Sequence, residues 1–176
     1  MGDGNLKIKN LYILSFLALT LLISACGGAT GAKENIGEVF KVALDSIMEY
    51  DEALNTDMEF IAINISAYED LSENDEEEIS SYFEDKYEID VTITSDTVQE
   101  LKETDVYDTD TNTLKGIFLS INEVEFKDEE NVLFKGSKFR SNTSGYELEF
   151  TVHYEDNEWQ TSDIEELFKL IENPTD

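Results

Sequence analysis

Gly145-Tyr-Glu-Leu-Glu-Phe-Thr-Val-His-Tyr154 is the stretch of sequence that decides the fold. Its apolar side chains stand at every second position and alternate with the polar residues Glu147, Glu149, Thr151 and His153. A repeat of two residues is the pattern of a β-strand with one face in a core and the other in water. We therefore predict a half-buried strand here, and a tight turn at Asp156-Asn157 that leads into a last strand.

The residues before this strand carry the same two-residue pattern from Leu114 onward. The pattern changes parity at Asn122-Glu123, which predicts a bulge in the first of these strands. Gly136 interrupts the next strand and predicts another bulge. We therefore expect the C-terminal half to be an antiparallel meander, which residues 164–171 close as a short helix.

Helical spacing is typical of the first half of the chain. Apolar residues between 36 and 54 recur every three to four positions and predict an amphipathic helix of four or five turns. Two shorter helices are expected to begin at Asn74, with Glu77 as its capping-box partner, and at Asp96. Short strands are predicted at 58–65 and 89–93.

This order of elements predicts the fold class. Helices with short strands come first and an antiparallel meander follows, so we expect one α+β domain over residues 36–172 with the meander packed on the helices. The order is broadly similar to that of cone-shaped α+β folds of the nuclear-transport-factor type. That resemblance implies a curved sheet that forms a pocket, and it implies no particular function.

The N-terminus has the three parts of a secretory signal. Lys7 and Lys9 precede an uncharged run from Leu11 to Ile23, and the small residues Ser24-Ala25 lead to Cys26. The run is shorter than the roughly 20 apolar residues that a membrane-spanning helix needs. One interpretation is an ordinary signal peptide that is cleaved and that a cysteine follows by chance. The other is a signal for lipidation of that cysteine.

The segment Ile23-Ser-Ala-Cys26 resembles the lipobox of bacterial lipoproteins. The resemblance implies that a signal peptide, residues 1–25, is removed and that Cys26 carries acyl chains. Residues 26–35 are then a flexible tether, and the domain lies on the extracytoplasmic face of the membrane. Two acyl chains give stable anchoring, whereas one gives marginal binding.

The charge of the chain limits its partners. Its 176 residues include 41 acidic and 12 basic ones, for a formal net charge of −29 at pH 7. Nucleic acid is not an expected partner, because phosphate binding needs a basic surface. Attraction to an anionic membrane surface is not expected either, so the acyl chains on Cys26 must make the attachment to the bilayer. Cationic proteins or peptides and calcium fit the acidity, and so does solubility alone.

The scarcity of cysteine and histidine excludes several chemistries. Cys26 is the only cysteine, so a lipidated chain has no disulfide, no cysteine nucleophile and no cysteine metal site. His153 is the only histidine, which excludes zinc sites that need two imidazoles. No Gly-x-Ser-x-Gly motif accompanies it, and we interpret His153 as a solvent-facing residue. No cofactor is expected.

A basic cluster near the C-terminal third is one candidate site. Lys135, Lys138 and Arg140 lie within six residues and could contact an anion or a partner. The alternative is that they pair across strands with Glu147 and Glu149, which would only stabilise the sheet.

A second candidate is a calcium site at Asp108, Asp110 and Asn112, which have the D-x-D-x-N spacing that opens an EF-hand loop. That loop needs glycine and glutamate where this chain has Thr113 and Leu119, so an EF-hand is excluded. A weaker calcium site and a polar turn remain as the alternatives.

The C-terminal third contains a G-S-K-F-R-S segment within 134–141, the strand at 145–154 and Asp156-Asn-Glu-Trp-Gln160. Together with the lipobox, these segments resemble the pattern of small lipoproteins of Bacillus-type Gram-positive bacteria. The chain departs from the pattern at 142–145, which is less rich in glycine, and at Asn157-Glu158. The family supplies no catalytic residues that could be assigned to this sequence.

Together these features favour a non-enzymatic, membrane-anchored extracytoplasmic domain that binds a protein, a peptide or a cation. The alternative is a lipid-anchored pocket protein, or a hydrolase that uses carboxylates. A filled core with an exposed apolar patch favours the first function. A closed pocket with a buried carboxylate favours the second.

Overall fold

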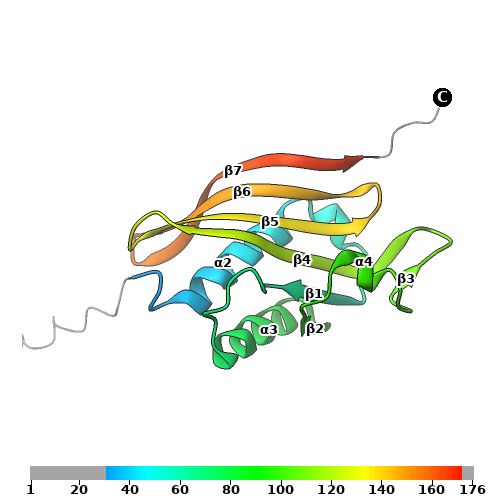
Figure 1. The fold of residues 1–176 in the computed structure, drawn as a ribbon, viewed down its shortest axis with the longest axis horizontal. Coiled ribbons are helices and arrows are strands. Elements are labelled where there is room, and N and C mark those ends of the chain that lie inside the picture. The colour runs from blue at the N-terminus through cyan, green and yellow to red at the C-terminus, as the bar shows by residue number, and fades with distance from the viewer. Residues whose placement is uncertain (1–30, 172–176) are drawn as a thin grey trace, which may run out of the picture. The chain divides into compact units, whose positions relative to one another are not determined.

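The computed structural model describes residues 31–171 (Figure 1), so the expected signal peptide and Cys26 fall outside the described residues. The folded domain begins within the segment that was expected to be a tether. Ala32 is only 1% exposed, and its N–H donates to the Glu129 carbonyl at 2.7 Å. Between residues 31 and 171, no helix combines the length and the apolar character needed to cross a membrane.

A seven-stranded sheet is the centre of the domain, in the order β2-β1-β4-β5-β6-β7 with β3 beside β4 (Figure 1). Its strands are β1 (Phe60–Asn64), β2 (Asp90–Ile93), β3 (Tyr107–Asp108), β4 (Thr113–Phe126), β5 (Asn131–Ser141), β6 (Ser144–Glu155) and β7 (Glu158–Ile171). The antiparallel meander from β4 to β7 is confirmed. β1 runs parallel to both β2 and β4, so the sheet is mixed.

The helices are α2 (Ile36–Glu49), a 3-10 turn η2 (Glu52–Asn55), α3 (Glu73–Tyr87) and the short α4 (Val98–Leu101). The predicted first helix is confirmed as α2, but it ends at Glu49, and Leu54 lies in η2 instead. The predicted starts of the other two are displaced, because the capping boxes are Ser72 with Asp75 and Thr97 with Glu100. In both cases a hydroxyl accepts from the backbone N–H three residues on, which satisfies a donor at the helix start.

The two faces of the sheet have different cores. α2 and α3 cover one face and form the larger core with it. Within this core Phe134 makes an edge-to-face contact with Phe40 and stacks on Phe150, with ring centroids 5.3 and 5.9 Å apart. Leu101 of α4 packs on the opposite face with Phe118 and Phe139 in a smaller core. The mixed α/β architecture is thus shown, and the cone shape stays a prediction.

One predicted bulge is confirmed and the other is wrong. The register between β4 and β5 shifts between Ile121 and Glu123, which leaves Asn122 as the extra residue. Gly136 instead pairs in register with Ile121 and Leu148. Its missing side chain makes room for α2, because a Cβ there would lie 2.8 Å from the Ser120 carbonyl oxygen and closer still to Ile47. The interruption in the pattern therefore marks close packing and not a bulge.

The hairpin turn at Asp156-Asn157 is confirmed, with φ of 53° and 72° at the two residues. The closing helix over 164–171 is wrong, because these residues continue β7 and pair with β6 as far as Ile171. Two register shifts interrupt this pairing, and Asp163 has a φ of 55°. Such irregularities place apolar residues at the spacing of a helix within a strand, which explains the error.

Candidate functional site

Lys138, one of the three basic residues predicted as a contact surface, lies inside the domain. Its side chain is 1% exposed, and its Nζ donates to the carbonyls of Met48 at 2.7 Å, Tyr50 at 2.9 Å and Asp51 at 3.1 Å. The Met48 and Tyr50 carbonyls lie at the end of α2, where few helical N–H groups remain to pair with them and where the helix dipole favours a cation, and the Asp51 carbonyl lies at the start of η2. Burial lowers the pKa of Lys138 to about 8, against the opposing effect of the Asp51 and Glu52 carboxylates. Lys138 therefore holds the end of α2.

Lys135 and Arg140 have other surroundings. Lys135 forms ion pairs with Glu123 at 2.7 Å and with Glu149 at 3.7 Å, and the latter is a cross-strand pair of the kind named as the alternative. Arg140 donates to the carbonyls of Gly116 and Thr56, both at 3.3 Å, and burial lowers its pKa. The structure does not bring the three cations together on one surface.

The loop at Asp108, Asp110 and Asn112 is a tight turn between β3 and β4. The Asp108 carboxylate accepts from the backbone N–H of Asp110 at 2.8 Å and of Thr111 at 3.2 Å, and these hydrogen bonds lower its pKa. Within residues 31–171 no group of three or more His, Cys, Asp or Glu side chains is placed to hold a metal ion. The calcium site stays a prediction.

His153 joins two polar side chains that sequence reasoning did not connect. Its Nδ1 lies 3.3 Å from the Ser162 hydroxyl, and its Nε2 lies 3.5 Å from a Glu155 carboxylate oxygen. Serine, histidine and glutamate are the residue types of a hydrolytic triad, which needs its carboxylate buried to orient the imidazole. Here the Glu155 side chain is 67% exposed. The Ser162–His153 hydrogen bond ties β7 to β6 at the surface, and Glu155 lies beside it on β6.

The outer strand β7 exposes the most conspicuous apolar patch of the described domain. Ile164, Leu167 and Phe168 are 45%, 44% and 56% exposed, and they are the large hydrophobic residues classed as exposed within residues 31–171. Every residue from 163 to 169 is exposed. β7 ends the sheet order, so no described strand pairs with its outer side. The sequence pattern missed this surface because it predicted a helix there.

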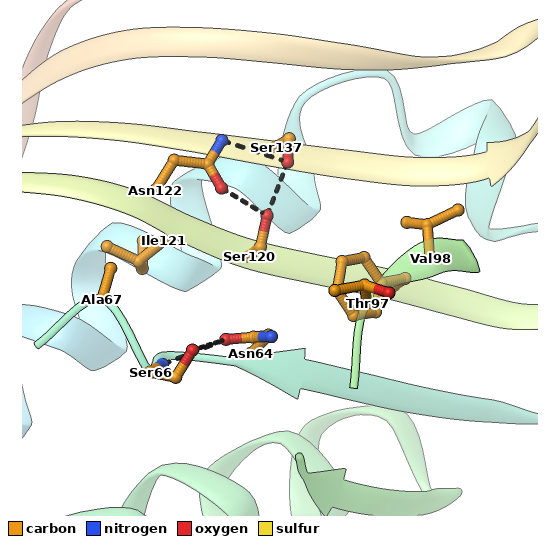
Figure 2. Close-up of a pocket in the computed structure, with 10 residues that line it drawn as sticks. Asn64, Ser66, Ala67, Thr97, Val98, Ser120, Ile121, Asn122 and Ser137 are labelled. Carbon is orange, nitrogen blue, oxygen red and sulfur yellow. Dashed lines mark hydrogen bonds between the residues drawn. The ribbon is translucent and has the colours of Figure 1, made fainter. Parts of the chain in front are cut away.

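A pocket of 430 Å³ opens on the face of the sheet that α2 and α3 leave uncovered (Figure 2). It lies between the end of β1, the start of α4 and the middle of β4 and β5. No charged residue lines it, and its lining residues are Asn64, Ser66, Ala67, Thr97, Val98, Phe118, Ser120, Ile121, Asn122 and Ser137. Sequence reasoning missed this pocket, and Ser120, a polar residue between the apolar Leu119 and Ile121, is the signal that could have indicated it.

Three polar side chains meet at one wall of this pocket. The Ser120 hydroxyl lies 2.6 Å from that of Ser137 and donates to the Asn122 side-chain oxygen at 2.8 Å. The Asn122 amide donates back to Ser137 at 3.4 Å (Figure 2). Their strands place them together, because Ser120 and Ser137 are register partners and Asn122 is the bulged residue beside them.

Comparisons with known proteins give no relative: the chain matches no protein-family model, no curated protein and no solved structure.

Proposed function

We propose that this chain is a lipid-anchored extracytoplasmic binding protein that binds a cationic, extended segment of another protein along β7. The observation that carries the proposal is the exposed apolar edge strand described above. It fits the first of the two functions that the sequence favoured, since the domain has a filled core and an exposed apolar patch.

The edge of a sheet binds extended chains through its backbone. Unpaired N–H and C=O groups on an edge strand add a further strand, and the side-chain contacts of alternate residues set the specificity. β7 spans 14 residues, and its exposed part carries three large apolar side chains. It is therefore long enough for such pairing and offers apolar contacts beside it.

The negative charge near β7 favours a cationic partner. Residues 163–169 contain three carboxylates, at Asp163, Glu165 and Glu166, against the single ammonium of Lys169. A second copy of the chain carries the same net charge of −29, so repulsion between the two copies opposes self-association along β7. A segment with lysine or arginine beside apolar residues complements both the carboxylates and the patch.

Binding is tested with a defined probe, a fluorescent peptide of alternating lysine and leucine, added to the purified full-length protein. We expect saturable binding by fluorescence anisotropy that weakens as salt is raised. A peptide N-methylated at alternate residues should bind much more weakly, because it cannot complete backbone pairing. Equal binding of the methylated and unmethylated peptides would overturn the strand-pairing mode.

Two charge-matched double variants locate the site. Asp163→Asn with Glu165→Gln removes two carboxylates from β7, and asparagine tolerates the positive φ at 163. Asp85→Asn with Glu84→Gln removes two exposed carboxylates from α3 as a control. We expect the β7 variant to lose affinity and the α3 variant to retain it. Equal losses would mean that the peptide responds only to net charge.

The anchor is tested separately through Cys26. We expect the wild-type chain, expressed in a Gram-positive host, to incorporate an alkyne-labelled fatty acid and to sediment with membranes. Cys26→Ala should lose the label and should not be retained as a mature membrane protein. A cleaved Cys26→Ala chain that stays on the membrane would refute lipid anchoring and leave the peptide-binding result untouched.

A further inference from the structure

The neutral pocket between β1, α4, β4 and β5 is a second surface, distinct from β7. We propose that it binds an uncharged polyhydroxylated ligand, such as a sugar ring. β6 separates β5 from β7 in the sheet order, so this site does not depend on the proposed strand pairing. The pocket volume of 430 Å³ lies within the roughly 300–1,000 Å³ typical of small-molecule sites.

The absence of charge from the lining is the first observation. Acidic and basic residues make up 30% of the chain, yet all ten lining residues are neutral. An anionic ligand would meet the negative field of the domain with no cation in the pocket to offset it. The same field attracts a cationic ligand, but such a ligand would lose water without gaining a carboxylate within the pocket. An uncharged ligand incurs neither cost.

The hydrogen-bonding pattern is the second observation. Ser137 can donate to Ser120, Ser120 donates to Asn122, and Asn122 donates to Ser137, so the three side chains close a ring. Each hydroxyl has used its single proton in this ring, and lone pairs remain on the oxygens. One N–H of Asn122 also remains. The wall thus offers several acceptors and a donor, which complements ligand hydroxyl groups.

The neighbouring strand β1 brings similar chemistry to the pocket, because Asn64 is the register partner of Ser120. The Asn64 amide donates one N–H to the Asp96 carbonyl at 2.9 Å, and its oxygen accepts from the Ser66 backbone N–H and hydroxyl. Its second N–H and the lone pairs of Ser66 remain available to a ligand. The lining also includes the apolar Phe118, two residues before Ser120 on β4, and Val98 of α4, which can contact the C–H face of a sugar ring.

The test uses three ligands of the same ring and different charge: glucose, glucosamine and glucuronate. Each is titrated into ¹⁵N-labelled full-length protein at 0.15 M NaCl in a detergent without a sugar head group, and amide shifts are followed by NMR. We expect saturable shifts at residues 120, 122 and 137 with glucose, and none with glucuronate. Tighter binding of glucosamine than of glucose, or no saturable shift with glucose, would overturn the proposal.

Two variants and a control tie binding to the pocket. Ser137→Ala removes one ring member and should raise the Kd for glucose about three- to tenfold. Ala67→Leu, at an exposed position on the rim, should also weaken binding because the longer side chain occupies the opening. Ser80→Ala makes the same chemical change on α3 and should leave the Kd unaltered. Unchanged binding in both pocket variants would overturn the assignment, whatever the result of the β7 experiments.

Discussion

The two faces of the sheet use lysine in opposite ways, although Lys135 and Lys138 belong to the same strand. Lys138 points into the face covered by α2, where it is 1% exposed and donates to three backbone carbonyls. Lys135 points to the uncovered face, where its side chain is 32% exposed and pairs with two glutamates. The comparison shows that position relative to α2, and not residue type, decides what each side chain contributes.

The two lysines differ because the two faces differ in their access to water. A polar group on the covered face must find a partner within the protein, because an unsatisfied buried group costs free energy. A group that is partly exposed on the uncovered face, such as Lys135, can exchange its partner for water at little cost. Substitutions on the two faces should therefore differ in their effect on the free energy of unfolding.

The largest effect is expected for Phe134→Ala on the covered face. Phe134 is fully buried between Phe40 and Phe150, so its loss leaves a cavity and should lower the free energy of unfolding by about 3–5 kcal/mol. Leu133→Ala, the neighbouring residue on the uncovered face, is the control and should cost distinctly less. Chemical denaturation of both variants checks this, and equal losses would contradict the asymmetry of the faces.

The next effect is expected for Lys138→Met. Methionine has a similar length but cannot donate, so the carbonyls at the end of α2 lose a shared donor. We expect the free energy of unfolding at pH 7 to fall by about 2–3 kcal/mol. Amide hydrogen exchange should increase most in the last turn of α2. Uniform exchange across the domain would mean that Lys138 does not act at that helix end.

The wild type and Lys138→Met should also differ in how their free energy of unfolding depends on pH. Lys138 has a pKa of about 8 in the folded state, whereas an unfolded lysine titrates near 10.4. Between pH 8 and 10 the unfolded state therefore binds more protons, so the folded wild type gains stability with rising pH relative to Lys138→Met. Denaturation at pH 7, 8, 9 and 10 checks the sign. A gap between the two proteins that narrows with pH would contradict the lowered pKa.

The spacing of apolar residues correctly predicted those elements whose structure depends mainly on local sequence. The strands of the meander, the Asp156-Asn157 turn and α2 follow from spacing alone. β7 beyond Asp163 did not follow, because Ile164, Leu167 and Phe168 fit a helix as well as an irregular strand. These residues form a strand because they pair with the edge of β6.

The sites were harder to predict than the fold. The parity of β5 puts Lys138 on the same face as Phe134, but only the end of α2 supplies acceptors that make a buried lysine acceptable. The neutral pocket depends on the register that brings Ser120 beside Ser137. A single sequence gives neither the position of the end of α2 relative to β5 nor the register between β4 and β5.

A smaller effect is expected for Gly136→Ala, which tests how closely α2 approaches the sheet. The added Cβ meets Ile47 and the Ser120 carbonyl, so we expect a loss of about 1–2 kcal/mol from overpacking. Gly31→Ala is the control, since its Cβ would meet only the movable side chain of Glu34 at 3.2 Å. Thermal unfolding of the two variants compares them, and a stable Gly136→Ala protein would mean that α2 can shift away from β5.

The smallest effect is expected for Lys135→Met on the uncovered face. Its ion pairs with Glu123 and Glu149 are exposed to water and screened by salt, so the denaturation midpoint should stay within experimental error of the wild type. Lys138→Met, the same change three residues along, provides the direct comparison. If Lys135→Met destabilised the protein as much as Lys138→Met, the uncovered face would have to be shielded from water. The proposed difference in stability effects between the two faces would then be contradicted on β5, the strand that carries both lysines.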